Sequence, residues 1–219
     1  MSNKNIEFAI YFIPEGAIYN LGSQIIGYDI KKKLVTKNTS IEELPNNNAA
    51  HYGFHLTLTD VVQINANQLS KVLKLTKAIC KISVFKNISI KLDKMGIMPN
   101  ANVYALQFKN SIKLWILHVF LVIFVQRLGT GSGYKHNVNM SAWRRVKTRH
   151  FLSPYIFDDF LPHISLASDV DRNTANKLHE LINKKLPKLS VLKIGTIAVV
   201  VRRGESKYFE ILETIKLGD

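Results

Sequence analysis

The sequence is short of three things: cysteine, acidic residues and long apolar runs. Its 219 residues include one cysteine, Cys80, which excludes an intramolecular disulfide framework and favours a reducing compartment. The most apolar run, 114–125, contains His118 and is too short for a membrane span of about 20 residues, so we expect a buried helix or a pair of strands. The first residues lack the pattern of a secretion signal. We therefore expect a cytoplasmic protein with no membrane partner.

The shortage of acidic residues leaves a strong positive charge. The sequence has thirty Lys and Arg residues and sixteen Asp and Glu residues, which gives a net charge of +14 and a pI near 9.8. Such a surplus raises the local concentration of polyanions, whether nucleic acids or phosphorylated small molecules. A solvated basic surface explains the same charge, so charge alone does not decide the function.

One pattern occurs twice: a histidine, an apolar residue, a hydroxyl residue and a leucine. The first copy, "HLTL", contains His55 and Thr57, and the second, "HISL", contains His163 and Ser165. Alternation with a period of two is typical of a β-strand. Each histidine should therefore share one face of its strand with the hydroxyl residue two positions later, and the apolar residues should share the other face.

The elements that follow the two motifs repeat in the same order. The motif histidines are 163 − 55 = 108 residues apart, and each motif strand is followed by a helix and two strands at nearly that offset. We interpret this as an internal duplication within one bilobal α/β domain, whose two units face each other across a shared cleft. We expect a first unit over about 51–108, a helical connection over about 109–157 and a second unit over about 158–219. Within these units we expect helices over 65–80 (capped by Asn65 or Asn67) and 169–186 (capped by Asp169 or Asp171), and strands over 84–98, 103–109, 190–203 and 206–217.

Two histidines on opposing strands, each with a nearby hydroxyl, suit displacement at a phosphodiester without a metal. One neutral imidazole takes a proton from the attacking hydroxyl, and one imidazolium gives a proton to the departing oxygen. Histidine suits both tasks because its pKa of about 6.5 lies near working pH. Thr57 and Ser165 would donate hydrogen bonds to the non-bridging oxygens of the phosphate.

The paired motifs resemble those of the two-histidine (2H) phosphoesterase superfamily, which includes RNA ligase/cyclic phosphodiesterase proteins. "MGIMPNANVYAL" is similar to the turn of the first lobe in that family. "AIYFIP", "LGSQIIGYD", "YGFHLTL" and "FDDFLPHISL" resemble a bacterial branch sometimes encoded beside phosphonate-utilisation genes. The resemblance implies an α+β fold of two βαββ-type lobes, with a concave antiparallel sheet cleft and outer helices. It also implies that His55 and His163 are the acid/base pair and that Thr57 and Ser165 bind phosphate.

The expected activity is metal-independent hydrolysis of a 2′,3′-cyclic nucleotide phosphate or an RNA terminal cyclic phosphate, with no cofactor and with the protein as a monomer. Two alternatives remain open at this stage. The same chemistry could act on a cyclic dinucleotide or a phosphorylated sugar. The protein could also be an inactive module that binds nucleotides or RNA.

Other side chains could reach the cleft. Tyr11 could border it and bind substrate by stacking on a base, although core packing is also compatible with its strand. His51 has the parity of His55 if that strand extends backward, but no acidic partner completes a metal site. We expect His118, inside the apolar run, to be structural. Six basic residues could bind additional phosphates: Arg144, Arg145, Lys147, Arg149, Arg202 and Arg203. A solvated charged face explains these clusters equally well.

Overall fold

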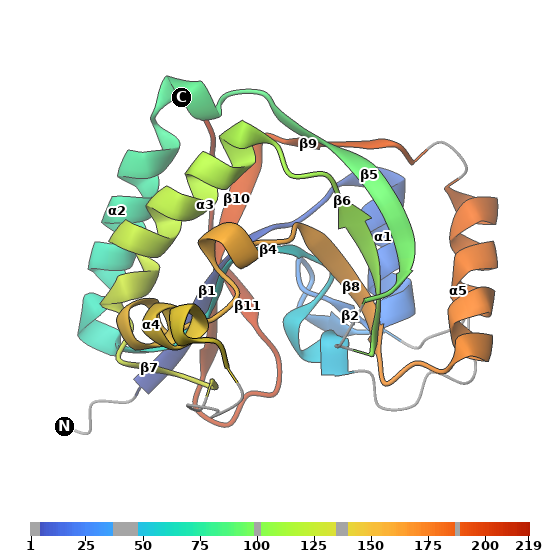
Figure 1. Cartoon of the computed structure of the whole chain (residues 1–219), viewed down its shortest axis with the longest axis horizontal. Coiled ribbons are helices and arrows are strands. Elements are labelled where there is room, and N and C mark those ends of the chain that lie inside the picture. Colours follow the sequence, from blue (N-terminus) through green and yellow to red (C-terminus); the bar gives the residue numbers. More distant parts are fainter. Residues whose placement is uncertain (1–4, 37–47, 99–101, 135–139, 187–188) are drawn as a thin grey trace.

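The computed structural model describes residues 5–36, 48–98, 102–134, 140–186 and 189–219 (Figure 1). Within these ranges the chain forms five α-helices and eleven strands, which confirms the predicted α+β class. The helices are α1 (Gly16–Ile26), α2 (Leu69–Cys80), α3 (Ile112–Phe124), α4 (Ala142–Phe151) and α5 (Arg172–Lys185). The strands are β1 (Asn5–Phe12), β2 (Tyr28–Asp29), β3 (Leu34–Val35), β4 (Leu56–Asn65), β5 (Ile88–Ile97), β6 (Val103–Phe108), β7 (Gly131–Ser132), β8 (His163–Ser168), β9 (Val191–Ile194), β10 (Thr196–Arg203) and β11 (Glu210–Lys216).

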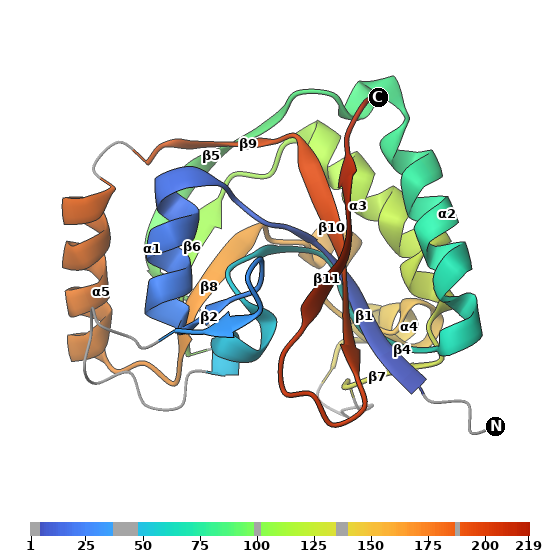
Figure 2. The same ribbon diagram turned by 180° about the vertical axis from the view of Figure 1, so that it is seen from behind.

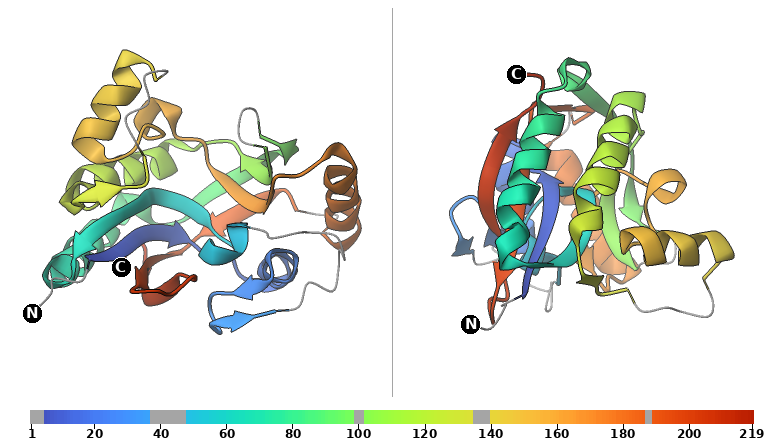
Figure 3. Two further views of the ribbon diagram at one scale, coloured as in Figure 1. Left: turned by 90° about the horizontal axis from the view of Figure 1, so that it is seen from below. Right: turned by 90° about the vertical axis from the view of Figure 1, so that its left-hand side faces the viewer.

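Two antiparallel sheets form the framework of the described part. One has the strand order β11-β10-β1-β4-β7 and the other has the order β8-β6-β5-β9. Helices α2 and α3 lie side by side and pack on the first sheet, whereas α1 and α5 pack on the second (Figures 1 and 3). The first motif strand, β4, contacts the second motif strand, β8, where the two sheets meet. One continuous apolar core supports both strands.

Strands of the two sequence units are exchanged between the sheets. The motif strand β4 pairs with β1, whose other neighbour is β10 from the C-terminal hairpin. The motif strand β8 pairs with β6, which belongs to the hairpin β5–β6 of the first unit. Each sheet therefore combines one motif strand with the hairpin of the other unit, and the duplicated sequence units do not coincide with the sheets.

The expected single strand over 190–203 is wrong, because the chain changes sheets at Gly195. Before this residue β9 pairs with β5, and after it β10 pairs with β1 (Figure 2). Apolar residues recur on both sides of the break, so the pattern alone shows one continuous run. The crossing joins the two sheets through the backbone as well as through the core.

The helices follow their sequence signals with one exception. The Asp171 side chain caps α5 by accepting a hydrogen bond of 2.7 Å from the amide of Thr174, as predicted. The predicted caps of α2, Asn65 and Asn67, are wrong, because a 3₁₀ turn over 66–68 comes first and Gln68 takes the cap position without a side-chain bond. The apolar run forms helix α3. No helix among the described residues has the length and hydropathy needed to cross a membrane.

Gly22 in α1 allows the closest approach between that helix and the segment leading to His55. A Cβ atom built on Gly22 would lie 2.2 Å from the ring of Phe54, which is buried directly before His55. Only a hydrogen fits in this position without moving the ring. The backbone that carries the first motif histidine therefore depends on a glycine far earlier in the chain.

Replacing Gly22 with alanine should lower the free energy of unfolding by about 1–3 kcal/mol, because the gain in helix propensity is smaller than the overpacking against Phe54. Urea denaturation measures the change. Gly195→Ala is the matched control, since its Cβ would meet no atom within 4 Å, and it should shift stability by less than about 0.5 kcal/mol. Equal stability of Gly22→Ala and wild type would contradict the packing.

Candidate active site

His55 lies immediately before β4 and is held at both ring nitrogens. Its Nδ1 lies 2.8 Å from the carbonyl oxygen of Gly53, and its Nε2 lies 3.1 Å from Oγ1 of Thr57. His55 and Thr57 therefore share one face, as the alternation predicts. Gly53 has a φ of +73°, and a Cβ there would lie 2.8 Å from Ile30, so the turn that aims this carbonyl at the imidazole requires glycine.

His163 opens β8 and repeats the same arrangement. Its Nδ1 lies 2.8 Å from the carbonyl oxygen of Leu161, again two residues earlier in the chain. A carbonyl oxygen can only accept, so Nδ1 carries the hydrogen in both rings. In the neutral form, the lone pair of each imidazole is therefore on Nε2. Ser165 lies on the same face of β8 as His163, and both line one cavity.

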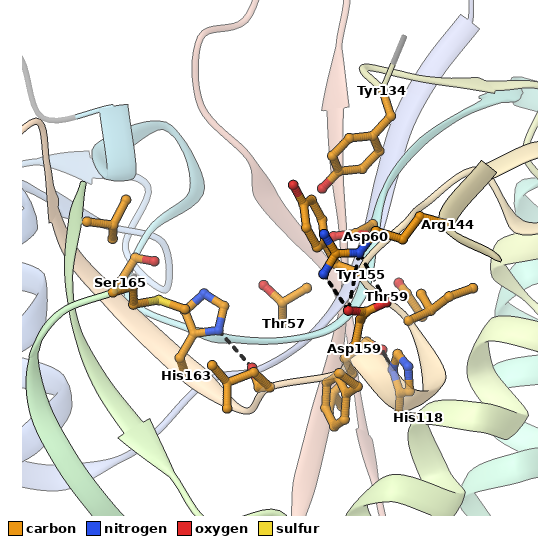
Figure 4. Close-up of a pocket in the computed structure, with 16 residues that line it drawn as sticks. Thr57, Thr59, Asp60, His118, Tyr134, Arg144, Tyr155, Asp159, His163 and Ser165 are labelled. Atoms are coloured by element: carbon orange, nitrogen blue, oxygen red, sulfur yellow. Dashed lines mark hydrogen bonds and ion pairs between the residues drawn. The ribbon is translucent and has the colours of Figure 1, made fainter. Parts of the chain in front are cut away.

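The cavity has a volume of about 610 Å³. It brings together three of the predicted site residues, Thr57, His163 and Ser165. Figure 4 shows His163 and Ser165 at one side and Arg144 and Asp159 at the other, with Thr57 between them. His55 is half-buried next to Thr57, and its side chain is not part of the cavity wall. It is close enough to His163 for the two rings to interact electrostatically.

Burial lowers the pKa of both motif histidines. For His55, loss of solvent is the largest cause, the nearby His163 adds to it, and the pKa falls to about 4. Loss of solvent also lowers the pKa of His163 below its ordinary value of 6.5. Both rings are therefore neutral at pH 7 in the free protein, and each can accept a proton at Nε2.

Of the two places that its strand allowed, Tyr11 occupies the one in the core. It is 1% exposed and does not line the cavity, and its ring stacks on His55 with centroids 3.7 Å apart. Behind it, Phe209 lies 6.3 Å away and in turn stacks on Tyr52. Tyr11 therefore supports the imidazole from the core side and does not extend the cavity wall.

His118 joins three parts of the fold and is structural, as expected. It is buried, its Nδ1 lies 2.7 Å from the carbonyl oxygen of Leu58, and its Nε2 accepts from the amide of Phe157 at 3.1 Å. Its ring also stacks on Phe160. The condition set for His51 is not met, because His51 belongs to a 3₁₀ helix, Asn48–Tyr52, and the strand does not extend back to it.

Asp60 is a site residue that the alternation pattern misses. Strand parity places it on the face opposite His55 and Thr57, but the pairing of β4 with β1 is irregular between Phe8 and Tyr11, and Asp60 reaches the cavity. Its carboxylate accepts hydrogen bonds from Ser153 and Tyr134, and burial raises its pKa. A charged residue within the apolar run "LTLTDVV" was the available signal.

The connection over 109–157 supplies much of the remaining wall. Tyr134, Arg144 and Tyr155 line the cavity together with Asp159, which follows the connection. Of the basic residues considered as phosphate ligands, Arg144 pairs with Asp159, whereas Lys147 is fully buried and pairs with Asp158 and Asp159. Lys147 is thus a structural anchor between α4 and the 3₁₀ helix Phe157–Asp159. Arg202 pairs with Glu7, while Arg145, Arg149 and Arg203 are exposed.

Acidic and thiol groups do not gather around the histidines in a way that would hold a metal. Among the residues that the structure describes, no group of three or more His, Cys, Asp or Glu side chains is arranged to bind a metal ion. The uncharged polar side chains that line the cavity with His163 include the hydroxyls of Thr57 and Ser165. These can donate hydrogen bonds to an anion without carrying charge.

Comparisons with known proteins support the fold. A family described as "Protein of unknown function (DUF1045)" matches residues 135–210, about a third of the chain. This match includes His163, Ser165 and the end of the connection. No curated protein sequence matches the chain.

Several solved structures match nearly the whole chain. E. coli LigT complexed with 3′-AMP has a TM-score of 0.53 at 13% identity and covers 99% of this chain and 100% of its own. A structure described as a phosphoesterase has a TM-score of 0.52 at 15% identity and covers 99% of both chains. TT0787 of Thermus thermophilus has a TM-score of 0.55 at 14% identity and covers 97% of this chain and 98% of its own. The chain therefore has the same fold as these solved structures, LigT, the phosphoesterase and TT0787.

Proposed function

We propose that this protein is a metal-independent phosphodiesterase that hydrolyses a 2′,3′-cyclic nucleotide phosphate or an RNA terminal cyclic phosphate. One observation carries the proposal: His55 and His163 are each tied at Nδ1 to a backbone carbonyl. Nε2 is then the atom of each ring that exchanges protons with a bound phosphodiester, and at His55 the substrate takes the place of the Thr57 hydroxyl that bonds Nε2 in the free protein. A nucleotide as substrate is consistent with the solved complexes of LigT with 3′-AMP, NADP⁺ and ATP.

In the proposed reaction, His55 is the base and His163 is the acid. His55 has a pKa of about 4 and is neutral over most of the working range, so its Nε2 can accept a proton from the attacking water. His163 lines the cavity, where the negative charge of a bound phosphodiester raises the pKa of an imidazole and favours its protonated form. Thr57 and Ser165 donate hydrogen bonds to the non-bridging oxygens and hold the phosphorus between the rings.

The proposed hydrolysis is a single displacement at phosphorus. The water oxygen forms a bond to phosphorus while its proton passes to Nε2 of His55. The bond from phosphorus to one ribose oxygen breaks, and that oxygen takes the proton from Nε2 of His163. The products are a phosphate monoester and a free ribose hydroxyl, and solvent exchange of protons restores both rings.

Substitution of either motif histidine by alanine should lower kcat on the preferred 2′,3′-cyclic nucleotide by at least about a hundredfold, because a proton-transfer group is lost. Thr57→Val and Ser165→Ala should each lower kcat by about ten- to a hundredfold. Product release in the presence of EDTA measures these effects. His150→Ala is the control, since His150 is exposed at the end of α4, and it should retain wild-type activity.

The same panel separates the alternatives if it includes cyclic dinucleotides and phosphorylated sugars. Hydrolysis of one of these compounds alone, still abolished by His55→Ala or His163→Ala, would keep the chemistry and change the substrate. Nucleotide binding without turnover, insensitive to both substitutions, would replace the enzyme with a binding module. Turnover that EDTA abolishes would contradict metal independence.

The pH profile of kcat/KM should lie on the acid side of neutrality. The free enzyme is competent when His55 is neutral and His163 is protonated, which holds best above about pH 4 and below the pKa of His163, itself under 6.5. We expect a maximum in this window and a loss of about tenfold per pH unit above it. NMR titration should show both imidazoles titrating below pH 6.5. A kcat/KM that begins to fall only above about pH 7.5 would contradict the lowered pKa values.

A further inference from the structure

The far end of the cavity is made by residues that the proposed chemistry does not use. Tyr134, Arg144, Tyr155 and Asp159 line it on the side away from Ser165, and Asp60 joins them from β4 (Figure 4). The first three come from the connection over 109–157. Hydrogen bonds from Ser153 and Tyr134 to Asp60, and from the amide of Asp60 to Gln126, hold this connection against β4.

Two tyrosine rings and one guanidinium group lie close together at this end. The rings of Tyr134 and Tyr155 meet edge to face with centroids 5.6 Å apart. The guanidinium of Arg144 lies 5.6 Å from the centroid of the Tyr155 ring, and Tyr155 is 51% exposed. A half-exposed tyrosine ring with a guanidinium over one of its faces is the kind of group on which proteins stack unpaired bases.

The polar groups at this end differ in how many hydrogen-bonding atoms they keep free for a ligand. The carboxylate of Asp159 already accepts from Arg144 and Lys147, and that of Asp60 accepts from Ser153 and Tyr134. Arg144 donates to Asp159 through Nε and Nη2, and its Nη1 makes no hydrogen bond with any residue in the described part of the chain. The guanidinium thus keeps donors for a ligand.

Net charge argues against a second phosphate here. Arg144 and Lys147 are balanced by Asp158 and Asp159, with Asp60 close by, so this end carries no surplus of positive charge. A neutral planar ligand with hydrogen-bond acceptors suits it better than an anion does.

We propose that this end of the cavity is a nucleobase subsite that prefers keto bases, guanine and uracil, over amino bases, adenine and cytosine. The inference rests on the proposed function, because it takes the ligand to be a nucleotide whose phosphate lies at His163. The base stacks on Tyr155, and Nη1 of Arg144 donates to the keto oxygen. Adenine and cytosine carry an amino group at the equivalent position and would set a donor against a donor.

The test uses the four 3′-nucleotides, 3′-GMP, 3′-UMP, 3′-AMP and 3′-CMP, which can bind without being hydrolysed. Calorimetric titration of the wild type should show the keto nucleotides binding about tenfold more tightly than the amino nucleotides, the effect expected of one hydrogen bond from a charged donor. Arg144→Gln should bring the affinities for keto and amino bases within about twofold of each other, because an amide can donate or accept. Arg145→Gln, on the exposed side of the same helix, should keep the full preference.

Tyr155→Leu is a second variant that leaves the ion pair of Arg144 and Asp159 in place. It should weaken binding of all four nucleotides by about tenfold while retaining the keto preference, because stacking does not depend on which base is bound. This variant keeps the proposal testable if Arg144→Gln loosens α4.

Equal affinity of the wild type for the four nucleotides, no binding of any of them, or a preference that survives in Arg144→Gln would overturn the subsite. A keto preference in binding, without hydrolysis of any cyclic nucleotide, would support the subsite and remove the proposed reaction. Hydrolysis that depends on both histidines but is equally fast for every base would support the proposed reaction and remove the subsite.

Discussion

The hydrogen bond between each motif imidazole and the carbonyl two residues before it is the constraint on which the site depends. It fixes the tautomer, the ring plane and the nitrogen available for reaction with a single contact. The two copies reach the same geometry by different backbone means. Gly53 supplies its carbonyl from a left-handed conformation, whereas Leu161 is followed by Pro162, which biases the preceding residue toward an extended conformation.

The exchange of strands between the sheets explains how the two motifs stay at a fixed distance. Since β4 is built into a sheet with β10 and β11, and β8 into a sheet with β5 and β6, neither motif strand belongs to a unit that can move by itself. Residues from both sheets, such as Phe8 and Ile164, form one apolar core. Moving His55 relative to His163 would therefore disrupt strand pairing and core packing together.

Local patterns predicted the parts of the site that depend on local structure, and they failed where a tertiary feature decides. Alternation placed Thr57 beside His55. The change of sheet at Gly195 leaves the apolar pattern intact, and the irregular pairing of β4 reverses the face of Asp60 without changing any residue type. The buried residues of α4 are Lys147 and Thr148, and a buried charged residue is contrary to the expectation from hydropathy.

The distribution of charge in the fold bears on how the imidazoles gain a proton. The chain carries a net charge of +14, yet Arg144, which lines the cavity, and Lys147 on the same helix are both paired with carboxylates. Burial leaves His55 and His163 neutral, and the neighbouring hydroxyls add no charge. In the proposed reaction, the charge that raises the pKa of His163 would therefore come from the bound anion itself. Such a site would carry little charge when empty and would acquire its acid together with its substrate.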